Sequence, residues 1–492
     1  MPCWIVFKKI MMTLSFILCL SLFLMVGLAS AWQRKNTTSD YYLASRSVPP
    51  WLVGLSAVAT NNSGYMFIGV IGYTYTAGIS AAWLMLGWIL GDFLASLFVH
   101  ARLRSVALAK NQSSYIGALN AWAGFGGKTF QRVAALLSLI FLLAYAGAQL
   151  VAGGKALQVL LQWPQWWGAI LGAVLVMLYC FAGGIRASIW TDAAQSLVMI
   201  LAMGMMLFVA VDALGGVTMV IDKMSAVDGF LDPIGSDLWL PGVGGLLAFI
   251  VGWLVAGFSV IAQPHIMVRF MTLNSTKGML QTRAWYYLWF IIFYLMATGV
   301  GLLARIYLPE SLLFGSAGFD AELALPTMAV QLLPSFLVGL VLAGIFAATM
   351  STADSLLLSC SAFITQDLVP EFFHNNLRNK LATIAVTLAA LTWALLNRES
   401  VFALVIFSWS MLGACFVPLI LVLVLRQPLS QGLALAFMLG GCATVLSLHL
   451  WGMSGAIYVG VPALGVSVII YALARLFGFA GHKGFAIESK NI

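Results

Sequence analysis

The chain has 492 residues, of which 62% are hydrophobic and only 8% are charged, with a formal net charge of +8 and a mean hydropathy of +1.00. Soluble globular domains carry about 25% charged residues, so this composition excludes an ordinary soluble protein. It predicts an all-α polytopic membrane protein. The apolar runs of about 20 residues are too long for barrel strands, and helices satisfy every backbone group in lipid.

The apolar runs predict about 13 transmembrane helices. They cover residues 11–32, 50–78, 80–101, 132–161, 168–185, 188–212, 240–262, 281–306, 334–360, 381–396, 401–425, 430–449 and 457–477. The first run has a second interpretation, because Lys8-Lys9, the apolar stretch and Ala29-Ser30-Ala31 also resemble a signal peptide. Arg34-Lys35 directly after the run favours a retained helix.

Thirteen spans place the two termini on opposite sides, and the basic residues indicate which side is which. With the N-terminus outside, the inner segments hold 18 of the 24 Lys and Arg residues, including Arg186 and Arg269. Cytoplasmic loops are enriched in Lys and Arg. We therefore expect a multi-pass plasma membrane protein, in the inner membrane of a bacterium, with a cytoplasmic C-terminus. Lys8 and Lys9 argue against this orientation for the first span.

In two spans, small and polar residues interrupt the apolar sequence at mid-membrane depth. In the span 50–78 the interruption is Leu55–Gly64, and the span from 240 contains five glycines and closes at Gln263-Pro264-His265. Each opens a block of five spans, which predicts two inverted repeats. The expected division is an extra N-terminal helix and loop over 1–45, repeats over 46–212 and 240–426, and two C-terminal helices with a short tail over 427–492. Close helix packing is the alternative explanation for most of the 47 glycines.

Three carboxylates, Asp92, Asp192 and Asp354, lie inside apolar spans. A charge at the membrane centre costs about 2.5–3.5 kcal/mol on insertion scales, so each requires a cation, a proton or water. Asp354 lies in a hydroxyl-rich stretch that suits a small hard cation. For Asp92 we expect a structural place near His100 or Arg102.

Several motifs follow one another between residues 40 and 425. They are Tyr42-Leu-Ala-Ser-Arg46-Ser, Ser56-Ala-Val-Ala-Thr-Asn-Asn-Ser-Gly64, Tyr145 with Val151-Ala-Gly-Gly154, Gly183-Gly184 with Trp190-Thr-Asp192-Ala-Ala-Gln195, Gln263-Pro-His-Ile-Met-Val-Arg269-Phe, and Met350-Ser-Thr-Ala-Asp-Ser355 leading to Ile364-Thr-Gln-Asp367. Together they resemble the sodium:solute symporter family, in the branch of the bacterial sodium/proline symporters. The resemblance implies thirteen helices, a leucine-transporter-type fold of inverted repeats, and symport of a small organic solute with sodium.

A sodium site can be argued from helical geometry. At 100° per residue, Ala348, Ser351, Thr352 and Ser355 fall within an arc of about 100°. The hydroxyls of Ser351 and Thr352 and the carbonyl of Ala348, with the carbonyls of Ala59 and Asn62 from the broken helix, make five oxygen ligands. By resemblance this is the family's main sodium site. The alternative is that the hydroxyls bond to carbonyls of their own helix.

A second cation site is predicted around Asp192, Asp354 and Ser355, since in related symporters a carboxylate at the position of Asp192 faces the sodium helix. Two carboxylates around one ion also raise the chance that one carries a proton. The alternative is that Asp192 pairs with Arg186.

The chain departs from the proline symporters around the solute. Those proteins carry an aspartate at the position of Asn61, and a Trp and a Tyr at the positions of Ala256 and Val260. Tyr145 is retained, and Trp253 lies nearby in the sequence. We expect a solute pocket formed by Ser63, Gly64, Tyr145, Trp253, Ala256 and Val260. Its solute is a small zwitterion or carboxylate such as proline.

The predicted function is therefore sodium-coupled import of a small organic solute by alternating access, with the solute, Na⁺ and membrane lipid as partners and neither a cofactor nor a nucleic acid. A proton-coupled carrier and a symporter-like membrane sensor are the alternatives. The chain ends about 15 residues after its last span, which argues against the sensor. An enzyme is not expected, because the sequence lacks a nucleophile–base pair, a phosphate loop or a metal motif.

Overall fold

The computed structural model describes residues 3–235, 238, 240–308, 319–373, 375–396, 401–453 and 458–481, without the side chains of 3–6, 159 and 160. This part of the chain is almost entirely helical, and its one isolated backbone bridge joins Val48 to Leu273. The all-α prediction from composition is confirmed.

The longer helices are α1 (Cys3–Ser30), α3 (Pro50–Gly64), α5 (Ala82–Ala109), α7 (Thr129–Leu161), α8 (Gln165–Gly183), α9 (Ile185–Ala213), α11 (Gly242–Phe258), α13 (Met279–Tyr307), α15 (Ser335–Ala362), α16 (Asn376–Leu396), α17 (Val401–Val424), α18 (Gln431–Leu450) and α19 (Gly460–Leu476). Shorter helices join or extend them: α2 (Thr38–Leu43), α4 (Ile71–Ala77), α6 (Tyr115–Ala123), α10 (Val217–Ser225), α12 (Pro264–Met271) and α14 (Ala324–Leu332).

Eleven segments of the described chain are long and apolar enough to cross a membrane. One of them, Pro50–Ala109, covers two of the predicted spans, and Gly460–Leu476 is a shorter apolar helix at the position of the last one. The apolar runs thus coincide with helices, while the number of thirteen crossings stays a prediction.

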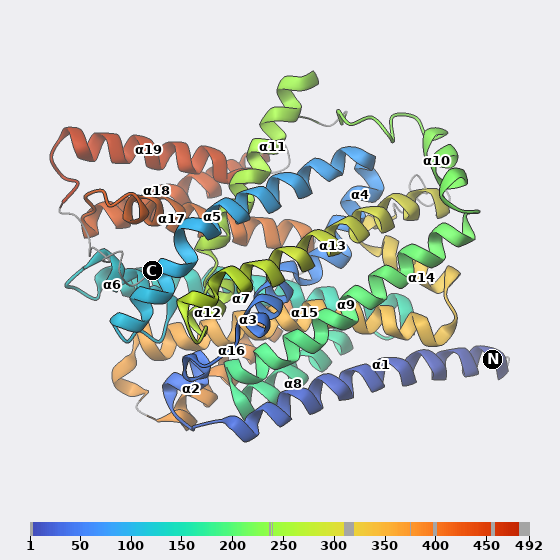
Figure 1. Ribbon diagram of the computed structural model, residues 1–492, viewed down its shortest axis with the longest axis horizontal. Helices are drawn as coiled ribbons and strands as arrows, with labels where there is room; N and C mark the ends of the chain where they lie inside the picture. Colours follow the sequence, from blue (N-terminus) through green and yellow to red (C-terminus); the bar gives the residue numbers. More distant parts are fainter. Residues whose placement is uncertain are drawn as a thin grey trace.

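Most helices run lengthwise through the molecule, with α1 along one long edge and α18 and α19 along the other (Figure 1). Helix α15 lies in the interior, where it packs against α1, α3, α7 and α9. With α17, it is the most enclosed of the candidate spans. Polar groups on α15 therefore face protein and not lipid.

The expected end of the span just before Gln263 is confirmed, because the apolar segment runs over Gly242–Ala262, but a further helix follows directly. After α11 the chain makes a tight turn over Ser259–Ala262, extends at Gln263 (φ −96°, ψ 99°), and starts a new helix, α12, at Pro264. Proline suits the first position of a helix, because that position needs no N–H donor and proline fixes φ near the helical value. Helix α12 therefore carries the rest of the motif into the protein interior.

Helices α5 and α11 approach each other so closely that their backbones touch. A Cβ added to Gly91 would lie 1.9 Å from the carbonyl oxygen of Leu254, and one added to Gly257 would lie 1.9 Å from that of Trp88. Small residues allow this kind of approach between membrane helices. The contact fixes the position of α5, which carries Asp92.

We predict that Gly91→Ala lowers the free energy of unfolding by about 1–3 kcal/mol, because the added methyl group must push the two backbones apart. Thermal unfolding of the purified protein in detergent measures the change. The control is Gly465→Ala in α19, where an added Cβ meets nothing within 4 Å and stability should stay constant or rise by up to about 1 kcal/mol. Equal melting temperatures of the two variants would contradict the predicted backbone contact.

Candidate functional site

The centre of the site is a break in the helix that begins at Pro50. Helix α3 is regular through Asn62, and the chain then leaves the helical conformation at Ser63 (φ 32°, ψ 178°). A wider, π-type turn over Tyr65–Val70 leads into α4. The expected interruption over Leu55–Gly64 is therefore shorter than predicted.

Side chains supply the hydrogen bonds at this break. The backbone N–H of Gly64 donates to Oε1 of Gln149 on α7 at 2.8 Å. The Asn62 amide donates to the Val58 carbonyl one turn earlier, also at 2.8 Å. Oδ1 of Asn62 is buried without a partner, so the break offers an oxygen that is free to bind a cation.

Hydroxyl groups of α15 bind the last turns of α3. Ser351 Oγ donates to the carbonyl of Ala59 at 3.0 Å and lies 3.2 Å from that of Ala348. Thr352 Oγ1 donates to the carbonyl of Thr60 at 2.8 Å. Four of the five predicted sodium ligands, Ala59, Ala348, Ser351 and Thr352, thus lie on the same helix–helix contact, and Asn62 is three residues beyond Ala59 on α3.

Both interpretations of these hydroxyls hold in part. Ser351 contacts a carbonyl of its own helix, as does Ser355, whose hydroxyl donates to Ser351 O at 2.6 Å. Yet the bonds to Ala59 and Thr60 cross from α15 to α3. The Ser351 hydroxyl therefore points toward Ala59, one of the predicted carbonyl ligands, whereas the Thr352 hydroxyl points toward Thr60, which was not among them.

Next to this contact lies a fully buried charge cluster. Arg269 on α12 approaches Asp192 on α9 at 3.4 Å and Asp354 on α15 at 3.5 Å, and all three side chains have no exposed surface. The same guanidinium nitrogen donates to the hydroxyls of Ser188 and Ser355. With both acids ionised, the cluster holds two negative charges and one positive charge. One further monovalent cation would neutralise it.

Neutral donors complete the cluster. The Ser56 hydroxyl donates to Asp192 at 2.6 Å, and the Tyr179 and Ser188 hydroxyls donate to Asp354 at 2.7 Å each. One oxygen of Asp192, Oδ1, is buried and has no partner. The structure therefore brings Asp192, Asp354 and Ser355 together, as the second cation site requires.

The alternative explanation for Asp192, a pair with Arg186, is wrong. Arg186 does not pair with Asp192; it donates to Asp40 at 2.7 Å and to the Ala44 carbonyl at 2.9 Å. Arg269, which the orientation argument counted among the basic residues of the inner segments, is fully buried. The proline start of α12 was the signal that could have placed Arg269 on a helix inside the bundle.

Asp92 also lies elsewhere than expected. Its carboxylate accepts hydrogen bonds from Tyr286, Tyr287 and Asn61, not from His100 or Arg102. His100 stacks on Phe270 instead, and Arg102 donates to the Val424 carbonyl at the end of α17. The side chains that donate hydrogen bonds to Asp92 are therefore all neutral.

The predicted solute-binding residues lie in two parts. Ser63 and Gly64 form the break, and the Tyr145 hydroxyl interacts with Ser63. Trp253 on α11 stacks on Trp88 with ring centroids 5.6 Å apart, and Trp88 in turn lies 5.8 Å from the ring of Tyr65 beside the break.

Ala256 and Val260 are both buried close to this aromatic group. Trp409 on α17 donates to the Ala256 carbonyl at 2.7 Å and packs against Trp88. Sequence reasoning missed Trp88, Trp409 and Gln149, because each acts through contacts between helices that lie far apart in the sequence.

Two cavities lie on the borders of the site. The wider one, about 460 Å³, is lined by residues of α4, α7 and the segment before α14, including Tyr73, Lys155 and Glu322. Phe402 separates it from the break by stacking against both Tyr65 and Tyr73. Lys155 pairs with Glu322 at 2.5 Å on its wall.

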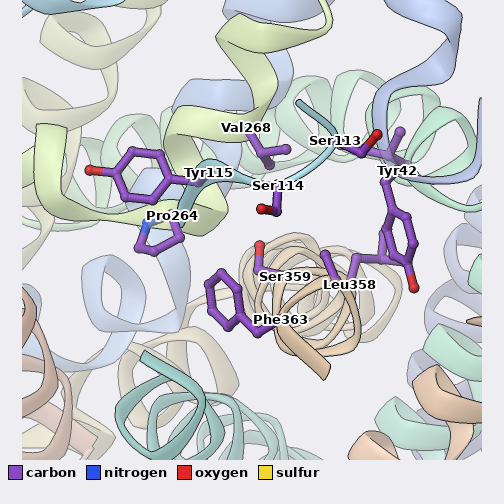
Figure 2. A pocket seen from close by; sticks show the side chains of 11 residues that line it. Tyr42, Ser113, Ser114, Tyr115, Pro264, Val268, Leu358, Ser359 and Phe363 are labelled. Carbon is purple, nitrogen blue, oxygen red and sulfur yellow. The ribbon is translucent and has the colours of Figure 1, made fainter. Parts of the chain in front are cut away.

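The narrower cavity, about 10 Å³, lies beside α12. Figure 2 shows Pro264 and Val268 of α12 on one side and Leu358 and Ser359 of α15 on the other. Tyr42 closes its edge, with its hydroxyl 2.9 Å from that of Ser361. This side of the bundle is therefore tightly packed, and the side near Phe402 is open.

The comparisons with known proteins agree with this geometry. The model of the sodium:solute symporter family matches residues 41–441. The osmoregulated proline transporter OpuE of Bacillus subtilis is 29% identical over 97% of this chain and 99% of its own, and the sodium/proline symporter of Escherichia coli is 28% identical over 90% and 89%.

Solved structures show the same fold. A substrate-bound sodium-coupled sialic acid symporter in an outward-open state superposes with a TM-score of 0.79 at 20% identity, covering 97% of this chain and 99% of its own. MhsT in complex with L-phenylalanine superposes with a TM-score of 0.51 at 14% identity over 86% of this chain and 98% of its own. The predicted leucine-transporter-type fold is confirmed.

The charge count of the buried cluster predicts that two substitutions lower stability by very different amounts. Arg269→Gln leaves two carboxylates without a cation and should lower stability in sodium-free buffer by about 3–5 kcal/mol. Asp354→Asn leaves one acid paired with Arg269 and should cost far less. Thermal unfolding with and without NaCl compares the two variants. A larger loss for Asp354→Asn would show that the acid contributes through its hydrogen bonds and not through its charge.

Proposed function

Because the chain belongs to the sodium:solute symporter family, we propose that it is a secondary active symporter that imports a small organic solute together with Na⁺ by alternating access. The contact between the broken helix α3 and the hydroxyl face of α15 supports this proposal most strongly. It juxtaposes carbonyls and hydroxyls that a sodium ion prefers as ligands, next to a break that frees backbone groups at mid-membrane depth.

The proposed main sodium site consists of Ala59, Asn62, Ala348, Ser351 and Thr352. The carbonyl of Ala59 and the hydroxyl of Ser351 are already within 3.0 Å of each other. A sodium ion would replace that hydrogen bond with two ion–oxygen contacts. Such an ion joins α3 to α15, so its binding and that of a solute at the break stabilise each other, typically by about 1–3 kcal/mol.

We propose Asp192, Asp354 and Ser355 as a second cation site that shares its charge with Arg269. The cluster carries a net charge of −1 when both acids are ionised, which one Na⁺ or one proton would neutralise. Arg269 occupies part of the site, so a cation that enters must share the carboxylates with the guanidinium. Binding there would loosen the hold of α9 and α15 on α12.

The solute is proposed to lie at the break, between Ser63, Gly64 and Tyr145 on one side and Trp253, Ala256 and Val260 on the other. Relatives named as proline transporters support a small zwitterion such as proline. Ala256 and Val260 are smaller than the Trp and Tyr expected there in the proline symporters, and the Trp409 ring, which packs against Trp88, donates to the Ala256 carbonyl. The chain is accordingly a transporter and not an enzyme.

The proposed orientation places the N-terminus outside and the C-terminus in the cytoplasm of a bacterial plasma membrane. Arg34 and Arg102 support it, because both lie at the end of the bundle that would face the cytoplasm, where Lys and Arg are enriched; Arg34 contacts Ala182 O, and Arg102 contacts Val424 O. In this orientation the wide cavity beside Phe402 faces outward. The repeats are proposed at residues 46–212 and 240–426.

We predict that Ser351→Ala combined with Thr352→Ala raises the sodium concentration for half-maximal proline uptake at least tenfold, a change of about 1.4 kcal/mol. Uptake of labelled proline into proteoliposomes at varied external NaCl measures it. The control is Thr387→Ala, which removes a buried hydroxyl that bonds only to its own helix. An unchanged half-saturation in the double variant would refute the proposed ligands.

A further inference from the structure

Asp92 is a buried carboxylate that the proposed sodium and solute sites do not use. It lies in α5, has no exposed surface, and forms no ion pair within the described chain. Retaining a bare charge at this depth costs several kcal/mol. The residue must therefore bind a positive ion or lose its charge.

Only neutral groups hold the carboxylate. Tyr286 donates to Oδ2 at 2.7 Å and Tyr287 donates to Oδ1 at 3.0 Å, both from α13. Asn61 of α3 donates to Oδ2 at 3.3 Å and to the Tyr286 hydroxyl at 2.6 Å. These four residues form one network in which α13, which packs against both α3 and α5, joins the two helices (Figure 1).

We propose that Asp92 is a proton-binding site whose occupancy controls the end of the broken helix α3. A proton fits better than a metal ion, because it adds one bond at a carboxylate oxygen and needs no further ligands, while the O–H and N–H donors around both oxygens lower the pH at which it binds. A bound Na⁺ would need oxygen lone pairs in their place and additional space. A proton from water forms an O–H bond at the carboxylate and needs neither.

The link to the broken helix passes through Asn61. Its amide nitrogen has two acceptors, Asp92 and Tyr286, while its Oδ1 is buried without a partner. When Asp92 takes up a proton, Asn61 loses a charged acceptor only two residues before the break at Ser63. The amide can then rotate so that its oxygen accepts a hydrogen bond from the new Asp92 O–H group. This rotation changes the contacts that α3 makes just before the break.

The other charged and titratable groups near Asp92 do not provide its carboxylate with a positively charged partner. From α13, Tyr294 lies within electrostatic range, and Arg283 binds the Ser96 carbonyl at 2.6 Å, one turn from Asp92 on α5. Helix α3 contributes no titratable residue, and neither does α11.

Two further groups lie on neighbouring segments. Arg269 of α12 contacts the separate carboxylates Asp192 and Asp354. His100, two turns further along α5, stacks on Phe270. Neither contacts Asp92, so the network has no positively charged partner of its own.

Infrared difference spectroscopy of the purified protein, recorded while pH is changed in sodium-free buffer, tests the proposal without any solute. We expect a protonated-carboxyl band that disappears as pH rises and that is missing in Asp92→Asn. The same titrating band in Asp92→Asn would overturn the proposal. So would loss of the Asp92 band on addition of NaCl at constant pH, because it would make Asp92 a sodium site.

A second variant keeps the test valid if Asp92→Asn does not fold. Tyr287→Phe removes one donor to the carboxylate and should move the midpoint of the band upward by about one to two pH units. Tyr294→Phe, the same change on the same helix without a hydrogen bond to Asp92, should move it less. Equal midpoints for the two variants would overturn the assignment.

The consequence for transport rests on the proposed function and has a separate measurement. Asparagine imitates the protonated acid, so Asp92→Asn proteoliposomes should take up proline at saturating NaCl at one rate from acidic to alkaline pH. That rate should equal the acidic rate of the unmodified protein. If proline is not carried at all, the proposed solute fails while the infrared result still decides the proton site.

Discussion

The enclosed guanidinium of Arg269 determines how the central helices meet. An arginine without water needs charged or polar partners, and here they come from α9 and α15, where Asp192, Asp354 and two serine hydroxyls all meet the Nη2 atom. Helix α12 can present Arg269 to them only because the chain breaks after α11. The break, the short helix and the paired carboxylates therefore form one arrangement, in which removal of Arg269 would leave two buried carboxylates without a positively charged partner.

The two helix breaks follow the same constraint. In lipid every freed backbone group needs a partner within the protein. At Ser63–Gly64 the partner is the Gln149 side chain. At the second break Gln263 donates to the Trp409 carbonyl, and the Trp409 ring donates back to Ala256. Neighbouring helices α7 and α17 thus stabilise the irregular segments, and their polar side chains are part of the site.

Hydropathy predicted the spans well because lipid imposes a simple requirement on length and polarity. The 100° spacing also placed Ser351 and Thr352 on one face of α15, and the structure directs both hydroxyls at α3. The partners of Arg269 and Asp92 could not be predicted in this way. Asp92 meets Tyr286 almost 200 positions later in the chain, and α12 is too short to produce an apolar run, so Arg269 looked like a loop residue.

The cavities on the two sides of the site show which parts must move during transport. Phe402 stands between the break and the wide cavity, and its backbone N–H donates to Glu322, the partner of Lys155. On the opposite side, α12 packs against α15 and leaves only the narrow cavity. Opening that side requires α12 to leave α15, which stretches the contacts of Arg269 with Asp354 and Ser355. Because α12 begins at one helix break and α3 ends at the other, the segments proposed to bind the ligands are also the ones that can act as hinges when the two sides open.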